Sequence, residues 1–176
     1  MQIEIAKYEN MSESGSSLKR LMQTNGTAEL DLLVRESIQN CLDAGDKKSE
    51  SVCVDFTVGE VETKTIANYF EKISSCLIER YSDRKGYIAI RDTNTVGLTG
   101  PIRIEDVVDN KFGNFRKLVY DISKPQDQSG SGGSWGLGKT IYFRIGIGLV
   151  IYYSRIYDER LGVYESRLAA TLVEDE

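Results

Sequence analysis

The sequence predicts an α+β fold, a two-layer α/β sandwich in which helices cover one face of a mixed, mainly antiparallel sheet. Strands are indicated where apolar and polar residues alternate, at 52–58, 87–91, 149–157 and 163–172. Helices are indicated where apolar residues recur at a spacing of three or four, at 28–44, 60–81 and 136–147, and we expect two short helices around Gly113 within 104–120. A chain of 176 residues, 40% of them hydrophobic, can bury one substantial core, so we expect a single domain over 1–176.

The first 27 residues predict a strand and a short helix ahead of the longest helix. Ile3 and Ile5 alternate with polar residues over 2–8, which is typical of a short strand. A serine-rich loop follows over 12–17, and Asn25-Gly26 ends the short helical segment after it. This stretch therefore adds one more strand to the predicted sheet.

The central helix, predicted from Ala28 to Ala44, has two different faces. Glu36, Asn40 and Asp43 stand at positions i, i+4 and i+7, which share one face of an α-helix. On the opposite face we expect buried apolar residues, namely Leu30, Val34, Ile38 and Cys41. Two carboxylates and an amide on one face could bind a ligand. The alternative is an ordinary amphipathic surface helix whose acidic residues face water.

A second candidate is Asp92, which follows the strand predicted over 87–91. The next residues, T-N-T-V-G-L-T-G at 93–100, read as a loop. A buried carboxylate here could accept a hydrogen bond from the exocyclic amine of adenine. It would reject guanine, which has a carbonyl at that position. An isolated acid at a strand end is usually structural, so this hypothesis depends on the other motifs.

A glycine-rich segment, G-G-S-W-G-L-G-K-T at 132–140, leads into the helix predicted over 136–147. Glycines let a backbone approach a ligand closely, and the first N–H groups of a helix attract anions. The segment therefore predicts a phosphate site. The preceding stretch is rich in glycine and serine, and we expect a mobile lid over 110–134.

The same segment satisfies the P-loop pattern G-x-x-x-x-G-K-[ST] from Gly133 to Thr140. A P-loop must follow a buried strand, whereas K-P-Q-D-Q-S-G-S-G precedes this segment. The P-loop interpretation also gives Glu36, Asn40 and Asp43 no role. A P-loop NTPase is therefore the weaker alternative.

Composition excludes several kinds of site. The chain has no histidine, which removes Ser-His and Cys-His catalysis and histidine metal sites within it. Cys41, Cys53 and Cys76 have no metal-like spacing, and we expect buried free thiols in a reducing, cytoplasmic compartment. The net charge of -5 shows no basic bias toward nucleic acid, and no apolar run is long enough to cross a membrane.

These three segments together resemble the Bergerat-fold ATPases of the GHKL superfamily, which includes gyrase, the large heat-shock chaperones, histidine kinases and MutL. The first family motif, E-x-x-x-N-x-x-D-A on a helix, is matched in full by Glu36, Asn40, Asp43 and Ala44. The D-A ending is similar to the MutL and chaperone forms, whereas histidine kinases usually lack it.

The other two family motifs are matched to different degrees. The second, D-x-G-x-G, corresponds to D-T-N-T-V-G-L, where Asp92 is present, Asn94 replaces the first glycine and Gly97 comes one residue late. The third, G-x-x-G-x-G, is matched by the glycines Gly133, Gly136 and Gly138.

The resemblance implies a Bergerat ATP-binding fold that binds ATP and Mg²⁺. Asn40 would bind the Mg²⁺ ion, Glu36 would act as the general base that activates water, and Asp92 would contact adenine. The other residues implied to line the nucleotide are Asp43, Gly97, Gly133, Ser134, Trp135, Gly136, Leu137, Gly138 and Thr140. We add Lys139 because of its charge, since it is not part of the family motif.

The expected function is a slow ATP hydrolase that acts as a conformational or dimerisation switch. The alternatives are a module that holds ATP without useful turnover, a kinase-type catalytic domain, and a structural interaction domain. The resemblance also leads us to expect that the chain is the N-terminal part of a longer protein, which would form a homodimer through regions beyond residue 176. A client protein or nucleic acid is not identified by the sequence, and no membrane partner is expected.

Overall fold

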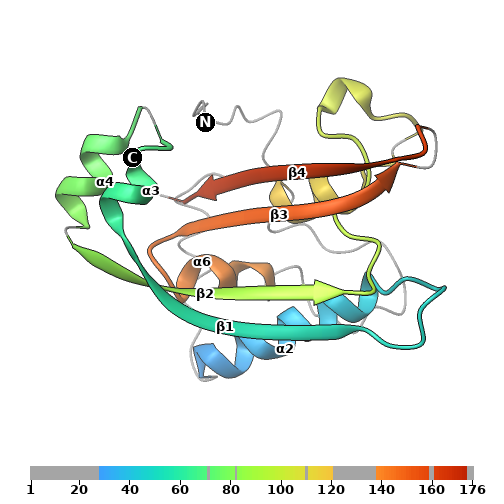
Figure 1. The fold of residues 1–176 in the computed structure, drawn as a ribbon, viewed down its shortest axis with the longest axis horizontal. Helices are drawn as coiled ribbons and strands as arrows, with labels where there is room; N and C mark the ends of the chain where they lie inside the picture. Colours follow the sequence, from blue (N-terminus) through green and yellow to red (C-terminus); the bar gives the residue numbers. More distant parts are fainter. Residues whose placement is uncertain are drawn as a thin grey trace. The chain divides into compact units, whose positions relative to one another are not determined.

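The computed structural model describes residues 28–70, 72–81, 83–109, 111–120, 138–158 and 161–173 (Figure 1). The strand predicted over 2–8 and the short helix after it lie outside these residues. The chain divides into two compact units. The first unit contains Val54–Asp92, and the second contains the described residues 28–53 and 93–173.

The α+β class is confirmed, but the prediction of a single sheet is wrong for the described residues. Their strands pair as two separate antiparallel hairpins, β1 with β2 and β3 with β4 (Figure 1). The prediction failed because alternation along a strand indicates which residues share a face, and carries no information on which strands become neighbours.

The first unit consists of one hairpin whose strands are joined by two short helices. β1 (Cys53–Glu62) and β2 (Arg84–Thr93) pair with each other. Between them lie α3 (Thr63–Ala67) and α4 (Ser74–Arg80). Apolar residues of the connection, Ala67, Phe70 and Leu77, are buried.

The helix predicted over 60–81 is therefore wrong at its start. β1 continues to Glu62 because its last residues pair with β2, and sheet pairing outweighs the helical spacing of the apolar residues. Gly59 permits this pairing, because a Cβ atom there would lie 2.6 Å from the Tyr87 hydroxyl oxygen. A turn after α3 then divides the remaining helical segment in two.

The second unit begins with α2 (Glu29–Asp43), which agrees with the predicted central helix to within one residue at each end. Its buried stripe consists of Leu33, Ser37 and Cys41. Leu33 is only 1% exposed, whereas Leu30 is 60% exposed and Ile38 is also exposed. Of the four residues predicted to be buried, Cys41 is buried and Val34 is half-buried, whereas the prediction is wrong for Leu30 and Ile38. The buried stripe of α2 lies between two faces of the helix, the polar face with Glu36 and Asn40 and the apolar face with Leu30 and Ile38. The sequence predicts it on the side opposite the polar residues.

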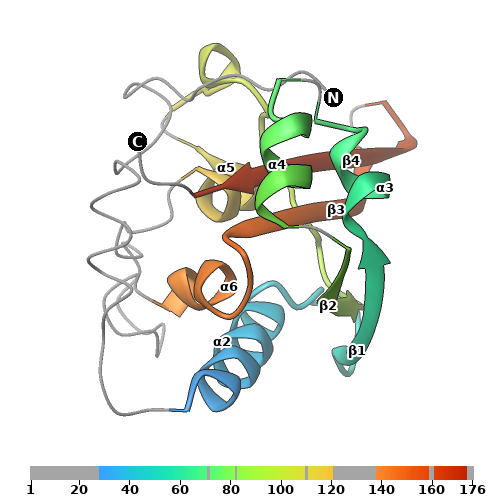
Figure 2. The same cartoon turned by 90° about the vertical axis from the view of Figure 1, so that its left-hand side faces the viewer.

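The rest of the second unit consists of short helices and a hairpin. The helices are η1 (Ile104–Asp106), α5 (Gly113–Val119), η2 (Gly138–Thr140) and α6 (Ile141–Arg144). The pair η1 and α5 confirms two short helices in 104–120, whereas the helix predicted over 136–147 is shorter than expected. Figures 1 and 2 show α6 beside α2, and the two helices are in contact.

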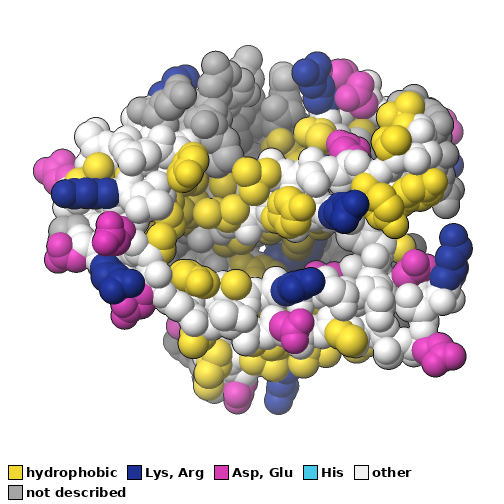
Figure 3. Space-filling model, viewed as in Figure 1, with side chains coloured by type: hydrophobic (Ala, Val, Ile, Leu, Met, Phe, Trp, Pro, Cys, Tyr) yellow, Lys and Arg dark blue, Asp and Glu magenta, His cyan; other side chains and the backbone are white. Residues whose placement is uncertain are grey.

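The hairpin of β3 (Leu149–Asp158) and β4 (Val163–Leu172) matches the two predicted strands closely. Its register runs from Leu149 opposite Leu172 to Asp158 opposite Val163. One face packs on α5, where Phe115, Val119 and Tyr152 form a buried cluster. The other face exposes the large apolar residues Ile151, Tyr153, Tyr157, Tyr164 and Leu168, which contribute to the hydrophobic surface in Figure 3.

Two arginines fix the loop that follows β2. Arg167 on β4 donates hydrogen bonds from its Nη1 to the carbonyl oxygens of Leu98 and Gly100, at 2.8 and 2.6 Å. Arg116 on α5 is buried and donates to the carbonyl oxygen of Ile102 at 3.1 Å. Each guanidinium donates to backbone oxygens of the loop and keeps the loop against the hairpin and α5.

The three cysteines differ from the expectation of buried thiols. All three are free, but only Cys41 is buried, while Cys53 and Cys76 are exposed. Cys53 begins β1, a strand most of whose residues are exposed, so its apolar alternation did not indicate burial. None of the described helices is long and apolar enough to cross a membrane.

Candidate functional site

Glu36 and Asn40 stand one helical turn apart on α2, beside its buried stripe. Both side chains are half-buried, with Ser37 fully buried between them. Burial raises the pKa of Glu36 above its ordinary value. A carboxylate with a raised pKa is a better proton acceptor than one fully in water, so the position suits a general base.

Asn40 is held by a tyrosine that lies 102 residues further along the chain. Its Nδ2 donates a hydrogen bond to the hydroxyl oxygen of Tyr142 on α6, at 3.0 Å. Tyr142 also hydrogen-bonds Ser37, and burial raises the pKa of its phenol. The bond occupies the amide nitrogen of Asn40, so the carbonyl oxygen is the atom that this side chain can offer to a cation.

A second contact joins the same two helices near the start of α2. Arg144 of α6 forms a salt bridge with Glu29, with 3.2 Å between Nη2 and Oε1. Together with the contact between Tyr142 and Asn40, it fixes α6 against α2. The structure therefore brings together the helix of the first sequence motif and the residues that directly follow the glycine-rich motif.

The C-terminal end of α2 is bonded to the loop that carries the altered second motif. Val96 donates its backbone N–H to the carbonyl of Ala44 at 2.8 Å, and Asp46 donates to the carbonyl of Asn94 at 2.9 Å. Gly45 and Thr95 form an antiparallel bridge between the two segments. These residues are about 50 positions apart in the sequence, yet the first and second motifs are neighbours in the second unit.

Asn94 stands where the motif of the resembled family has its first glycine, and its backbone is in a conformation that glycine favours. Its backbone φ is 64°, a left-handed conformation that asparagine adopts more readily than most residues. Its side-chain Nδ2 donates to the carbonyl oxygen of Ser51 at 3.0 Å, which holds the residue in place. Asparagine thus supplies the backbone conformation for which glycine is the usual residue.

Gly97 is placed against β3. Its φ is 66°, and a Cβ atom there would lie 2.6 Å from the Ser154 hydroxyl oxygen. Asn114 donates a hydrogen bond to its carbonyl oxygen at 3.1 Å. These contacts give Gly97 a structural role in seating the loop on the hairpin, in addition to any contact with a nucleotide.

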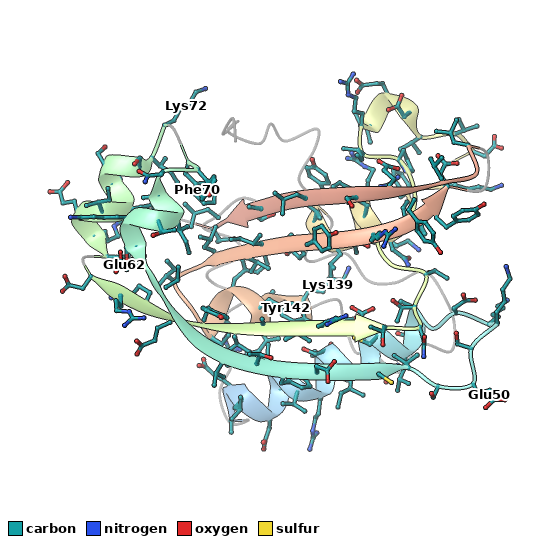
Figure 4. The ribbon with its side chains drawn as sticks, in the orientation of Figure 1. Glu50, Glu62, Phe70, Lys72, Lys139 and Tyr142 are labelled. Carbon is teal, nitrogen blue, oxygen red and sulfur yellow. The ribbon has the colours of Figure 1, made fainter. Side chains whose placement is uncertain are left out.

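Lys139 and Thr140 are both buried in η2, the segment that leads into α6. Figure 4 labels Lys139 and also Tyr142, which lies on α6. The ammonium group of Lys139 donates a hydrogen bond to the carbonyl oxygen of Lys117 at 2.7 Å. Lys117 lies in the last turn of α5, where carbonyl groups lack partners within the helix and attract cations. Lys139 therefore links α5 to the glycine-rich motif.

The two aspartates proposed for the site are exposed. Asp43 accepts a hydrogen bond from Nε2 of Gln39 at 2.8 Å, on the outer side of α2. Asp92 is in β2 and belongs to the first unit, and its burial, which was the premise of the adenine hypothesis, is not found.

Several predicted site residues lie outside the described residues, namely Gly133, Ser134, Trp135, Gly136 and Leu137. Of the lid expected over 110–134, the structure describes 111–120, which include α5. Phe115 and Val119 of α5 are buried in the core, so this part of the range has apolar anchors. The remaining part, 121–134, lies outside the described residues.

Sequence reasoning did not identify Tyr142 or Ser37. The run I-Y-F-R at 141–144 has the composition of a core helix, and nothing in it indicates that the tyrosine hydroxyl reaches Asn40. Ser37 occupies a position between Glu36 and Asn40 and is buried, where its Oγ donates to the Leu33 carbonyl at 2.6 Å. A serine among charged helix residues gave no signal of such a contact.

The oxygen chemistry available on α2 fits Mg²⁺. This ion prefers hard oxygen ligands and keeps several positions for phosphate oxygens and water, so one amide oxygen from the protein is sufficient. Among the described residues no group of three His, Cys, Asp or Glu side chains could hold a metal ion. In the arrangement that the resemblance implies, Asn40 would hold Mg²⁺ together with the phosphates of a nucleotide.

No protein-family model matches the chain, and no curated protein or solved structure matches it either.

Proposed function

We propose that this protein binds ATP with Mg²⁺ and hydrolyses it slowly, as a GHKL-type domain that acts as a conformational or dimerisation switch. One observation carries the proposal. Glu36 and Asn40 are half-buried on α2 and face the segment that follows the glycine-rich motif, to which Asn40 is hydrogen-bonded. This contact supports a site shared by the polar face of α2 and the segment that ends at Tyr142.

In this proposal Asn40 and Glu36 have separate chemical roles. Asn40 would hold Mg²⁺ through its carbonyl oxygen, and the ion would supply positive charge to the nucleotide phosphates. Glu36 accepts a proton from the attacking water, and its raised pKa suits that task. The glycine-rich segment that ends at Thr140 binds the phosphates through its backbone N–H groups.

Magnesium-dependent binding of ATP is the first test. Calorimetric titration with ATP should show binding in Mg²⁺ that weakens strongly in EDTA, and Asn40→Ala should remove the difference between the two conditions. Asn68→Ala, which truncates an exposed amide in the first unit, is the control and should behave as the parent. Equal ATP binding by the parent with and without Mg²⁺, or no binding at all, would contradict the proposed function.

A further inference from the structure

Tyr142 takes part in a group of hydrogen bonds with residues of α2. Ser37 donates its hydroxyl proton to the Leu33 carbonyl at 2.6 Å, and it also hydrogen-bonds the Tyr142 hydroxyl. At Asn40 the Tyr142 oxygen accepts a hydrogen bond from Nδ2, at 3.0 Å.

The hydrogen bond to Tyr142 sets the orientation of the Asn40 amide. An amide has one oxygen and one nitrogen, and rotation by 180° exchanges their positions. With Nδ2 committed to Tyr142, the oxygen Oδ1 must point to the other side. Only the oxygen can bind a cation, so an amide in the wrong orientation would present N–H donors to Mg²⁺ and repel it.

We propose that Tyr142 is a positioning residue that orients Asn40 so that its carbonyl oxygen faces Mg²⁺. The inference rests on the proposed function and deepens it by assigning a role to a residue outside all three motifs. Because Tyr142 follows the glycine-rich segment by only a few residues, it also connects the segment proposed to bind the phosphates with the proposed metal ligand. The metal site would then depend on the placement of α6.

The test compares Tyr142→Phe in two backgrounds. In the parent, the Mg²⁺ concentration for half-maximal ATP binding should rise about 3- to 10-fold, as for loss of one orienting hydrogen bond. Binding of ATP in EDTA should not change. In an Asn40→Asp background the same substitution should have no effect on Mg²⁺ dependence, because both terminal atoms of a carboxylate are oxygens and either can face the metal.

A packing role for Tyr142 predicts a different pattern, in which the loss is equal in both backgrounds. Tyr152→Phe is the control, since it also removes a buried hydroxyl in the second unit but has no contact with Asn40 among the hydrogen bonds of the described residues. Thermal unfolding of each variant confirms that it is folded.

The outcomes separate this inference from the function on which it rests. Parent-like Mg²⁺ dependence in Tyr142→Phe, an equal loss in the Asn40→Asp background, or failure of Asn40→Asp itself to bind Mg-ATP would each overturn the positioning role. In those cases magnesium-dependent binding by the parent would still support the proposed function. If the parent itself shows no magnesium-dependent binding, both are wrong.

Discussion

Replacement of Glu36 by alanine is expected to lower ATP hydrolysis about 100-fold or more while Mg-ATP binding is retained. The carboxylate is the only proposed proton acceptor for the attacking water, and it lies one turn from Asn40 without being a metal ligand itself. Its removal should therefore affect the chemical step rather than binding. Because turnover is expected to be slow, phosphate release should be measured in a single turnover with the protein in excess over labelled ATP.

Asp31→Ala provides the matched control for this experiment. Asp31 is an exposed carboxylate in the first turn of the same helix, so its loss changes the net charge equally but removes no proposed catalytic group. Its single-turnover rate should stay within about twofold of the parent, as expected for a surface substitution away from the site. Hydrolysis by Glu36→Ala at the parent rate would show that Glu36 is not the general base.

Replacement of Gly113 by alanine is expected to destabilise the protein by about 3 kcal/mol or more. Gly113 begins α5 with a φ of 68°, and a Cβ atom there would lie 2.5 Å from the Gly100 Cα and 2.6 Å from the Thr99 carbonyl oxygen. These are backbone atoms, which cannot move aside as a flexible side chain does. Both the left-handed conformation and the close approach therefore oppose a side chain.

Gly146→Ala is the matched control, because a Cβ atom there would meet no other atom within 4 Å. Urea unfolding of the two variants and the parent should show a large fall in the midpoint for Gly113→Ala alone, with similar slopes. Equal midpoints for the two glycine variants would mean that the backbone contact between Gly100 and Gly113 is not maintained in solution.

The helices and strands that could be predicted from the sequence are those whose own residues show a clear apolar period. The helix over 28–44 and the strands β3 and β4 have regular periods over ten or more residues, and the structure places them within one or two residues of expectation. The helix expected over 60–81 failed because its first residues pair with β2, a partner that the local period does not reveal.

The candidate site was predictable in part, for a similar reason. The spacing of Glu36 and Asn40 was sufficient to place them on one helical face. The buried stripe of α2 lies beside this face, and not on the opposite side where the sequence predicts it. Its position depends on packing against α6, which comes about 100 residues later in the chain. The contacts of Tyr142 and Arg167 are likewise long-range hydrogen bonds of single side chains, for which an amphipathic pattern contains no signal.

The long reach of these contacts has a consequence for the synthesis of the chain on the ribosome. The loop at 98–100 is translated well before Arg167, whose guanidinium satisfies its carbonyl oxygens, and Asn40 is translated 102 residues before Tyr142. Closing such long loops delays folding until the late partner is available. Nascent chains arrested before β4 should therefore remain sensitive to protease in the loop after β2, and the second unit should gain protection only after Arg167 has left the exit tunnel.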